Sequence, residues 1–256
     1  MGFLVSFNRI QLDQENLVAA IGDHWPPAQV DAVLELLSSS DGKFPSGVRK
    51  LPSALVNAVQ RERLIAAMLR AASELGYRET NVQDVIERAG VSRPTFYEHF
   101  DNKEDCFLAA FDTTAARLRD RVAAATRQGG DSWRDRLRFG LETLLDFTAT
   151  EPDAARTLIV EARAASAKAV MRRDHLLEYF AECIDAQVQE LLPDAPSYSA
   201  ITSAGMVGGI EALLYARLNK GEYDDLNSLL PSMMYFLVLP FEGHEAASEE
   251  LAVAVS

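Results

Sequence analysis

The sequence predicts an all-α protein. Apolar residues recur at intervals of three and four through most of the chain, the spacing of one helix face. Glycine, proline, serine and asparagine stand at the ends of these periodic stretches, where helices start and stop. The sequence shows no strand-like alternation bounded by turn residues. We therefore expect a helix-turn-helix followed by a larger helical body.

The first expected helix covers residues 55–75 and ends at Gly76, a good C-terminal cap. Asn81 then offers a side-chain oxygen to the free N–H groups of the next helix, and Asp84 lies near the positive end of its dipole. Gly90 tolerates the positive φ that a sharp turn between two helices requires. These signals predict a second helix with one apolar face, formed by Val82, Val85, Ile86 and Ala89.

The third expected helix begins after Ser92, a good N-cap, and carries Pro94 in its first turn. Phe96 and Phe100 are four residues apart, so they share a face and can anchor the helix to a core. The other positions are rich in hydrogen-bond donors, as a helix that lies against DNA requires. A plain helical hairpin is the alternative, but these outward residues favour DNA: Arg93, Thr95, Tyr97, Glu98 and His99.

The stretch Val91-Ser92-x-x-Thr95-Phe96-Tyr97-x-His99-Phe100-x-x-Lys103-Glu104 resembles the signature of the TetR family of bacterial transcription repressors. The resemblance covers roughly residues 55–111. Two positions depart from it: Asn81 stands where the family usually has threonine, and Cys106 where it usually has leucine. The resemblance implies an N-terminal three-helix helix-turn-helix domain and a C-terminal helical bundle that binds an effector and dimerises.

The resemblance also implies the roles of several residues. We expect Arg93 and Thr95 to contact bases, and Thr80, Tyr97, His99 and Lys103 to contact phosphates. The basic pair before the first helix can reach the minor groove, although a solvated loop would look the same. The expected DNA-binding set is Arg49, Lys50, Thr80, Ser92, Arg93, Pro94, Thr95, Tyr97, His99 and Lys103.

We divide the chain into residues 1–46 (extension and linker), 47–106 (DNA-binding domain), 107–245 (effector-binding and dimerisation domain) and 246–256 (tail). Two short amphipathic helices are expected within residues 1–42. These residues form a packed accessory element or a mobile tail, or else the start of the protein has been assigned too far upstream. The body is expected to contain a long helix from Lys103 to about Gly129 and helices over 133–148, 153–165, 169–192, 199–218 and 225–239, the last closing before Pro240.

The helix over residues 199–218 contains three glycines, and each costs about 1 kcal/mol relative to alanine. Close approach of another helix would explain them. The family pairs its last two long helices across a two-fold axis, so the resemblance implies a homodimer; packing within one chain is the alternative. The expected interface is Gly205, Met206, Gly209, Ile210, Leu213, Met233 and Leu237.

The family's body usually holds a small-molecule pocket between its helices. Aromatic residues, methionines and many alanines indicate a mostly apolar pocket and an apolar effector. A plain core or surface role is the alternative for each candidate lining residue: Phe139, Phe147, His175, Tyr179 and Tyr215.

The 256-residue chain has a net charge of −13, but residues 43–106 hold ten basic and nine acidic side chains, so the expected DNA module is the least acidic part. Two cysteines and no apolar run near the ~18 residues of a membrane span favour a cytoplasmic protein.

We find no phosphate-binding loop, zinc spacing or catalytic triad, and expect no cofactor, metal site or enzymatic activity. The alternatives are a helical ligand-binding or adaptor protein that has lost DNA binding and, with no residue in its favour, a helical enzyme.

Overall fold

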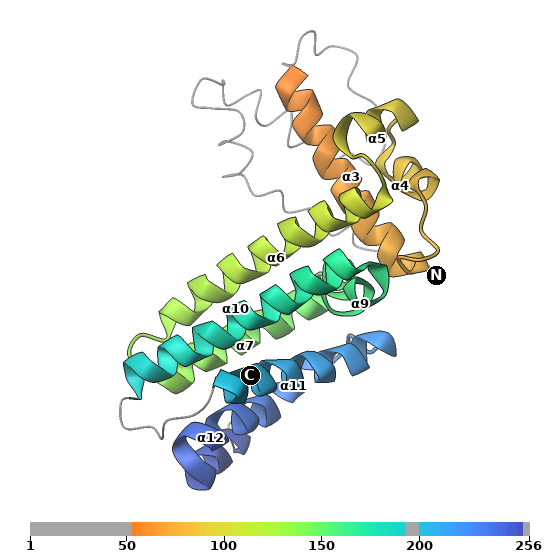
Figure 1. Cartoon of the computed structure of the whole chain (residues 1–256). Coiled ribbons are helices and arrows are strands. Elements are labelled where there is room, and N and C mark those ends of the chain that lie inside the picture. Colours follow the sequence, from red (N-terminus) through yellow and green to blue (C-terminus); the bar gives the residue numbers. More distant parts are fainter. Residues whose placement is uncertain (1–52, 193–199, 253–256) are drawn as a thin grey trace, which may run out of the picture. The chain divides into compact units, whose positions relative to one another are not determined.

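A computed structural model describes residues 53–192 and 200–252 of the chain. Every regular element within these ranges is a helix, with no strand among them, which confirms the predicted all-α class (Figure 1). The described residues form two compact units. The first comprises the residues up to Ala71 together with Thr80–Phe107, and the second comprises Ala72–Glu79 and the residues from Leu108 onward.

The expected helices of residues 1–42 and the basic pair Arg49 and Lys50 lie outside the described residues. The structure therefore leaves the N-terminal extension and the minor-groove arm as predictions.

The first unit is built from α3 (Ser53–Leu75), α4 (Val82–Ala89), α5 (Arg93–His99) and the start of α6 (Lys103–Gln128). The α4 helix begins with a reciprocal cap, because Asn81 Oδ1 accepts from the Gln83 and Asp84 N–H groups while Asp84 Oδ2 accepts from the Asn81 N–H. It ends at Gly90, whose φ of 64° is the left-handed value predicted for the turn.

Two phenylalanines anchor α5 to the core of the first unit. Ser92 Oγ accepts from the Thr95 N–H at 3.3 Å and starts the helix. Phe96 and Phe100 are buried, and their ring centroids lie 5.9 Å apart. Leu64, Met68 and Cys106 are also fully buried in this unit. The predicted helix-turn-helix is therefore formed, with the polar positions of α5 left on its other face.

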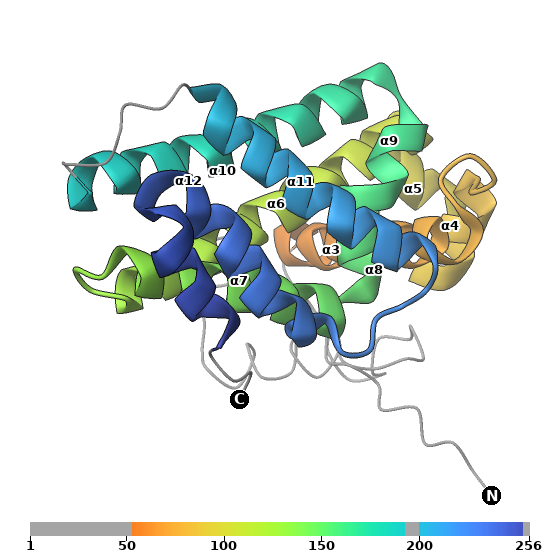
Figure 2. The same cartoon turned by 90° about the horizontal axis from the view of Figure 1, so that it is seen from below.

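The second unit is a helical bundle in which α10 packs against α11, and α7 packs against both α10 and α12 (Figure 2). Its core contains the fully buried Leu145, Phe147, Leu214 and Leu237. Besides the rest of α6, its elements are α7 (Trp133–Thr150), α8 (Pro152–Arg156), the π-helical turn η1 (Thr157–Glu161), α9 (Ala162–Ala165), α10 (Ala167–Leu191), α11 (Ala200–Asn219), the 3₁₀ turn η2 (Leu226–Leu229) and α12 (Leu230–Leu251).

Two predictions about the body need correction. The single helix expected over residues 153–165 is interrupted by η1. The last helix does not close before Pro240 but continues as α12 to Leu251, with a break at Gly243, whose φ is 84°. Burial outweighs the proline stop signal, because Phe241 packs edge-on against Trp133 at 5.6 Å and Glu250 pairs with an arginine of α7. Residues 246–251 are therefore part of a packed helix and not of a tail.

A buried carboxylate, Glu161, ties the turn that follows α3 to the rest of the second unit. The Tyr77 N–H donates to Glu161 Oε2 at 2.8 Å. Arg156 donates from Nη2 to Glu161 Oε1 at 3.1 Å and from Nη1 to the Leu218 carbonyl at 2.8 Å. The turn, η1 and the end of α11 thus share one hydrogen-bonded network.

Candidate functional site

The α5 helix presents polar side chains on the face opposite its aromatic anchors. Arg93, Pro94, Tyr97 and Glu98 are exposed, and the Tyr97 side chain, at 51% exposure, rests edge-on against the buried Phe96 ring at 5.3 Å. Because the helix is fixed by its cap and by its buried face, these exposed groups have defined positions.

The cap also organises two predicted contact residues. Thr95 Oγ1 and Ser92 Oγ lie 2.8 Å apart, so the two hydroxyls share a hydrogen bond at the start of α5. Ser92 is exposed and Thr95 is half-buried. Ser92 and Arg93 are thus both exposed at the start of the helix, and their contacts with DNA stay predictions.

His99 occupies a less exposed position near the end of α5. Its Nε2 lies 3.4 Å from Gln60 Oε1 on α3. Partial burial lowers the pKa of the His99 imidazole below its usual value; Glu98 opposes this shift and Arg61 adds to it. The lowered pKa favours the neutral imidazole, which can offer a hydrogen bond to DNA.

One predicted phosphate contact is corrected by the structure. Thr80 is only 1% exposed, and its hydroxyl donates to the Ala71 carbonyl at 3.1 Å, so this side chain holds the turn together and does not face a phosphate. Lys103 Nζ donates to the Thr80 carbonyl at 2.8 Å, which places the lysine charge beside the start of α4. The exposed capping residue there is Asn81, one of the two positions at which this chain departs from the family pattern.

The sequence reasoning missed Arg61 as a neighbour of this surface. Its guanidinium lies 5.4 Å from the centre of the Phe100 ring, and its side chain is 43% exposed. Since its charge also lowers the pKa of His99, Arg61 supplies a cation beside the end of α5. No local motif marks Arg61, because it lies on α3, 32 residues before Arg93 in the sequence.

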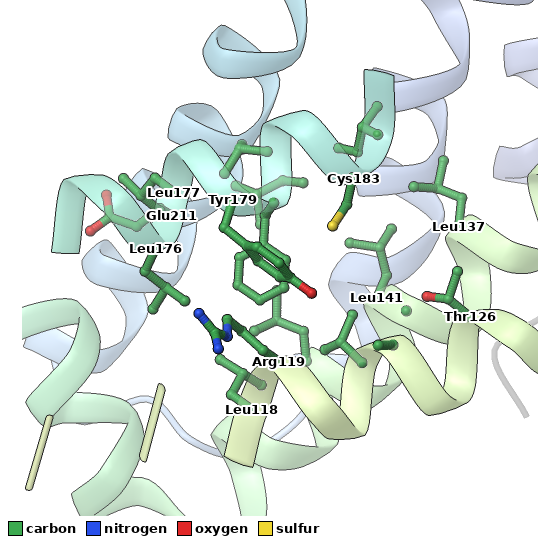
Figure 3. Close-up of a pocket in the computed structure, with 18 of the residues that line it drawn as sticks. Leu118, Arg119, Thr126, Leu137, Leu141, Leu176, Leu177, Tyr179, Cys183 and Glu211 are labelled. Carbon is green, nitrogen blue, oxygen red and sulfur yellow. The ribbon is translucent and has the colours of Figure 1, made fainter. Parts of the chain in front are cut away.

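The second unit contains a cavity of about 340 Å³ with mostly apolar walls (Figure 3). Leucine, isoleucine, valine and phenylalanine side chains from five helices provide most of the lining. The walls come from α6, α7, α10, α11 and α12, with further residues from η1. This volume is within the usual range for small-molecule sites.

Two of the five predicted pocket residues, Phe147 and Tyr179, line this cavity. Phe139 is not among its walls, and Tyr215 instead lies under the Arg163 guanidinium at 4.3 Å. His175 is exposed and lines a second cavity of about 300 Å³. The missed lining residues include Leu118, Val122 and Thr126, whose spacing of four along α6 was an available signal.

Charged side chains at the main cavity differ in their pairing. Glu211 is buried and accepts from Arg163 and from Arg173, with Arg173 Nε at 3.0 Å. Arg136 contacts Glu190 at 3.3 Å. Arg119 instead lies over the Tyr179 ring at 4.9 Å, and Figure 3 shows its guanidinium next to Leu176 and Tyr179.

The predicted dimer residues do not share one exposed face. Leu213 is 48% exposed and Gly205 is exposed, but four others are buried within the chain. A side chain at Gly209 would meet the Phe236 ring of α12 at 3.2 Å, so contact within one chain accounts for that glycine. Four of the seven predicted residues are therefore covered by their own chain, and the dimer interface stays a prediction. The buried positions are Met206, Ile210, Met233 and Leu237.

Residues 53–192 and 200–252 contain no group of three or more histidine, cysteine, aspartate or glutamate side chains that could hold a metal ion. Nor is any helix within these ranges long and apolar enough to cross a membrane.

Known proteins resemble both the helix-turn-helix and the whole described fold. Residues 64–110 match the family model described as bacterial regulatory proteins, tetR family. The HTH-type transcriptional activator FasR of Mycolicibacterium smegmatis is 29% identical over 116 residues, which are 45% of this chain and 52% of that protein. The HTH-type transcriptional regulator BetI of Stenotrophomonas maltophilia is 31% identical over 88 residues, 34% of this chain and 45% of that protein. The chain thus spans about half the length of these curated relatives.

Among solved structures, the fatty acid degradation regulator FadR from Bacillus halodurans superposes with a TM-score of 0.64 at 18% identity, covering 74% of this chain and 97% of that one. The FadR regulator of Bacillus subtilis, in complex with stearoyl-CoA, gives a TM-score of 0.63 at 19% identity, covering 71% of this chain and 99% of that one. These likenesses show a shared fold. Residues 64–110 therefore resemble the tetR family of bacterial regulatory proteins, and the described chain shares the fold of these regulators.

Proposed function

We propose that the chain is a DNA-binding transcriptional repressor that binds a palindromic operator as a homodimer in the bacterial cytoplasm and responds to a mostly apolar effector. The observation that carries this proposal is the geometry of α5. Phe96 and Phe100 fix the helix from below, its cap fixes its start, and Arg93 and Tyr97 extend outward. A short helix with such a face can enter a major groove and contact base edges.

A second copy of the chain is the partner that such an operator requires, because two recognition helices must reach successive major grooves. Exposed apolar residues on α11 and α12 support this pairing: Ile201 is 78% exposed, Leu213 48% and Phe236 43%. A side chain at Gly205 would meet no atom of its own chain within 4 Å. Gly205→Leu should therefore weaken the dimer in sedimentation velocity without unfolding it, and an unchanged dimer would place the interface elsewhere.

The apolar cavity supports an apolar effector. The fold is shared with a regulator whose structure contains stearoyl-CoA, which is consistent with a long-chain ligand here as well. An effector would release DNA only if it binds one conformation more tightly than the other, since a ligand shifts an equilibrium by its difference in affinity.

The test is fluorescence anisotropy of the full chain on duplex DNA from its own upstream region and on a scrambled duplex, at several salt concentrations. Tight, salt-sensitive binding that prefers the upstream duplex would support the proposal. Arg93→Ala should change sequence preference and cost about 1–3 kcal/mol at the contacted base pair. Lys103→Gln should weaken binding to both duplexes and reduce the salt slope by about 1. Arg127→Ala, an exposed change at the end of α6, is the control.

A helical ligand-binding or adaptor protein without DNA affinity is the second candidate. It is favoured by two exposed carboxylates at the end of α5, Glu98 and Asp101, which would repel nearby phosphates. Equal, weak binding to both duplexes, together with retained effector binding, would support this candidate over the repressor. If the chain instead prefers the upstream duplex, transcription from that promoter would separate repression from activation. Activation is the role that the name of FasR states for that relative.

A further inference from the structure

We propose that Arg119 binds the anionic head group, a carboxylate or a phosphate, of an amphiphilic effector whose apolar chain fills the 340 Å³ cavity. This inference rests on the proposed effector function and names the chemical class of its ligand.

Arg119 is an exposed residue of α6 that borders two cavities. It lines both the apolar cavity and the second cavity of about 300 Å³, and Leu176 is the other residue that lines both. The second cavity is the more polar of the two, because Asp112, Arg172 and His175 contribute to its walls. A molecule with its chain in the first cavity and its head in the second would pass Arg119.

Arg119 is also the guanidinium at this position that lacks a carboxylate partner among the described residues. Arg172 Nε donates to both oxygens of Asp112, at 2.8 and 3.0 Å. Arg173 is paired with Glu211, and Arg136 contacts Glu190. Arg119 instead stacks on the Tyr179 ring with its Cζ atom 4.9 Å from the ring centre.

Stacking leaves a guanidinium free to donate at its edge. A cation over an aromatic face keeps its N–H groups in the plane of the guanidinium, where they match the two oxygens of a carboxylate or phosphate. Burial raises the pKa of the Tyr179 hydroxyl, and its hydrogen bond to Cys183 adds to that effect, so the ring beneath Arg119 is uncharged at neutral pH. The stacked ring therefore contributes no competing negative charge.

One carboxylate opposes an anion in the second cavity. Asp112 lies in its wall, but both of its oxygens accept from Arg172, which neutralises the pair. His175 is exposed in the same wall and adds an N–H donor. With Asp112 and Arg172 balanced, Arg119 gives the second cavity a net positive charge.

The apolar cavity specifies the rest of the ligand. Its walls include Leu118, Leu141, Leu144, Phe180 and Ile184. An unbranched alkyl chain would gain about fourfold in affinity for each buried methylene, from about 0.8 kcal/mol per CH₂. The gain should stop at the chain length that fills the cavity.

The test uses four ligands with the same ten-carbon chain: decanoate, decyl phosphate, decanol and decyltrimethylammonium. Their affinities are measured by isothermal titration calorimetry on the full chain and on Arg119→Gln. Arg127→Gln, an exposed arginine of the same helix that lines neither cavity, is the matched control.

We expect at least one of the two anions to bind about tenfold or more tightly than decanol, and the cation to bind less tightly, because a hydrogen bond to a charged group contributes about 1.5–3 kcal/mol. The tighter anion, carboxylate or phosphate, identifies the head group. Arg119→Gln should remove this preference while leaving decanol affinity within about twofold, which also shows that the variant is folded.

Binding that does not distinguish the anions from decanol, or a preference that survives in Arg119→Gln, would overturn the assignment of Arg119 while leaving an apolar effector in place. An equal loss in Arg127→Gln would also overturn it, since the effect would then be general charge. If none of the four ligands binds, the apolar effector of the proposed function fails as well, and DNA binding can still be tested alone.

Discussion

The helices within each of the two units are held in place by different kinds of contact. Helices of the first unit are fixed by contacts between residues three apart: Asn81 with Asp84, Ser92 with Thr95, and Asn102 with Asp105. The second unit is tied by arginine–carboxylate pairs that span long stretches of chain, including Arg163–Glu211, Arg134–Glu242 and Arg138–Glu250. Local sequence therefore determines the proposed DNA-reading helix, whereas the cavity depends on distant residues meeting.

This difference matters for evolution of specificity. A change on the outer face of α5 alters one exposed side chain, because the caps and the aromatic anchors are other residues. A change at a charged residue of the cavity removes one partner of a pair that joins two helices, as for Glu211 of α11 and Arg173 of α10. We therefore expect the reading surface to tolerate substitution more easily than the cavity wall.

The largest expected effect comes from breaking the buried pairs of the second unit. Glu211→Ala would leave Arg173, whose side chain is 16% exposed, with only the exposed Asp174 as a carboxylate partner. Removing one partner of a buried pair costs about 3–5 kcal/mol, because the remaining charge stays desolvated. Urea unfolding, followed by circular dichroism, measures this loss.

The matched control is Glu222→Ala, which removes the exposed pair with Arg217. Both side chains of that pair are more than 40% exposed, so the cost should be below about 1 kcal/mol. If the two variants lost equal stability, long-range buried pairs would not be what distinguishes the second unit.

The two cysteines offer a second comparison, one for each unit. Cys106 is fully buried in the first unit, and burial raises the pKa of its thiol; Cys183 is half-buried and faces the cavity (Figure 3). Iodoacetamide should therefore label Cys183 at least about a hundredfold faster, since a local opening of about 3 kcal/mol already gives that factor. Mass spectrometry of timed samples measures both rates.

Cys183→Ser isolates the buried thiol. In this variant, labelling of Cys106 should stay slow in buffer and become complete in denaturant. Rapid labelling of Cys106 in the folded variant would show that the first unit opens far more readily than its buried core indicates.

Most of the first unit could be predicted from the sequence because its signals are local. The Asn81 cap, the Gly90 turn, the Ser92 cap and the Phe96–Phe100 spacing each act within four residues, and the structure has all of them. The direction of the Thr80 side chain could not be predicted. Its hydroxyl donates to the carbonyl of Ala71, nine residues earlier, across a turn whose shape is not specified by any single residue.

The site in the second unit was less predictable for a related reason. Aromatic residues were expected to mark the pocket, yet Phe139 and Tyr215 lie outside it, and Arg119 and Cys183 lie in its wall. The cavity walls are formed where five helices meet, so whether a given apolar residue lines the cavity depends on the rotation of its helix. The same ambiguity affected α11, where Met206 and Ile210 of the predicted dimer interface are buried within the chain.

A smaller effect should come from removing a local cap in the first unit. Asn81→Ala would leave the Gln83 and Asp84 N–H groups without their acceptor and should cost about 1 kcal/mol, within a range of about 0.5–2 kcal/mol. Denaturant unfolding gives the value. Arg70→Ala, an exposed change on α3, should stay within about 0.5 kcal/mol of the parent. A cap loss no larger than this control would weaken the argument that local contacts hold the first unit.

The smallest effect concerns His99, whose contact with Gln60 spans 39 residues and is a long-range tie within the first unit. Partial burial lowers the pKa of the folded-state imidazole below its usual value of about 6.5, so the unfolded chain takes up a proton at a higher pH than the folded chain does. The contribution of the lowered His99 pKa to the free energy of unfolding is fully present above about pH 6.5. It is lost as the pH falls through the folded-state pKa. Unfolding experiments between pH 5 and 8 should show this slope in the parent and a smaller one in His99→Gln. His175→Gln, which removes an exposed imidazole from the second unit, is the matched control, and an unchanged slope in His99→Gln would mean that His99 is solvated like a surface residue.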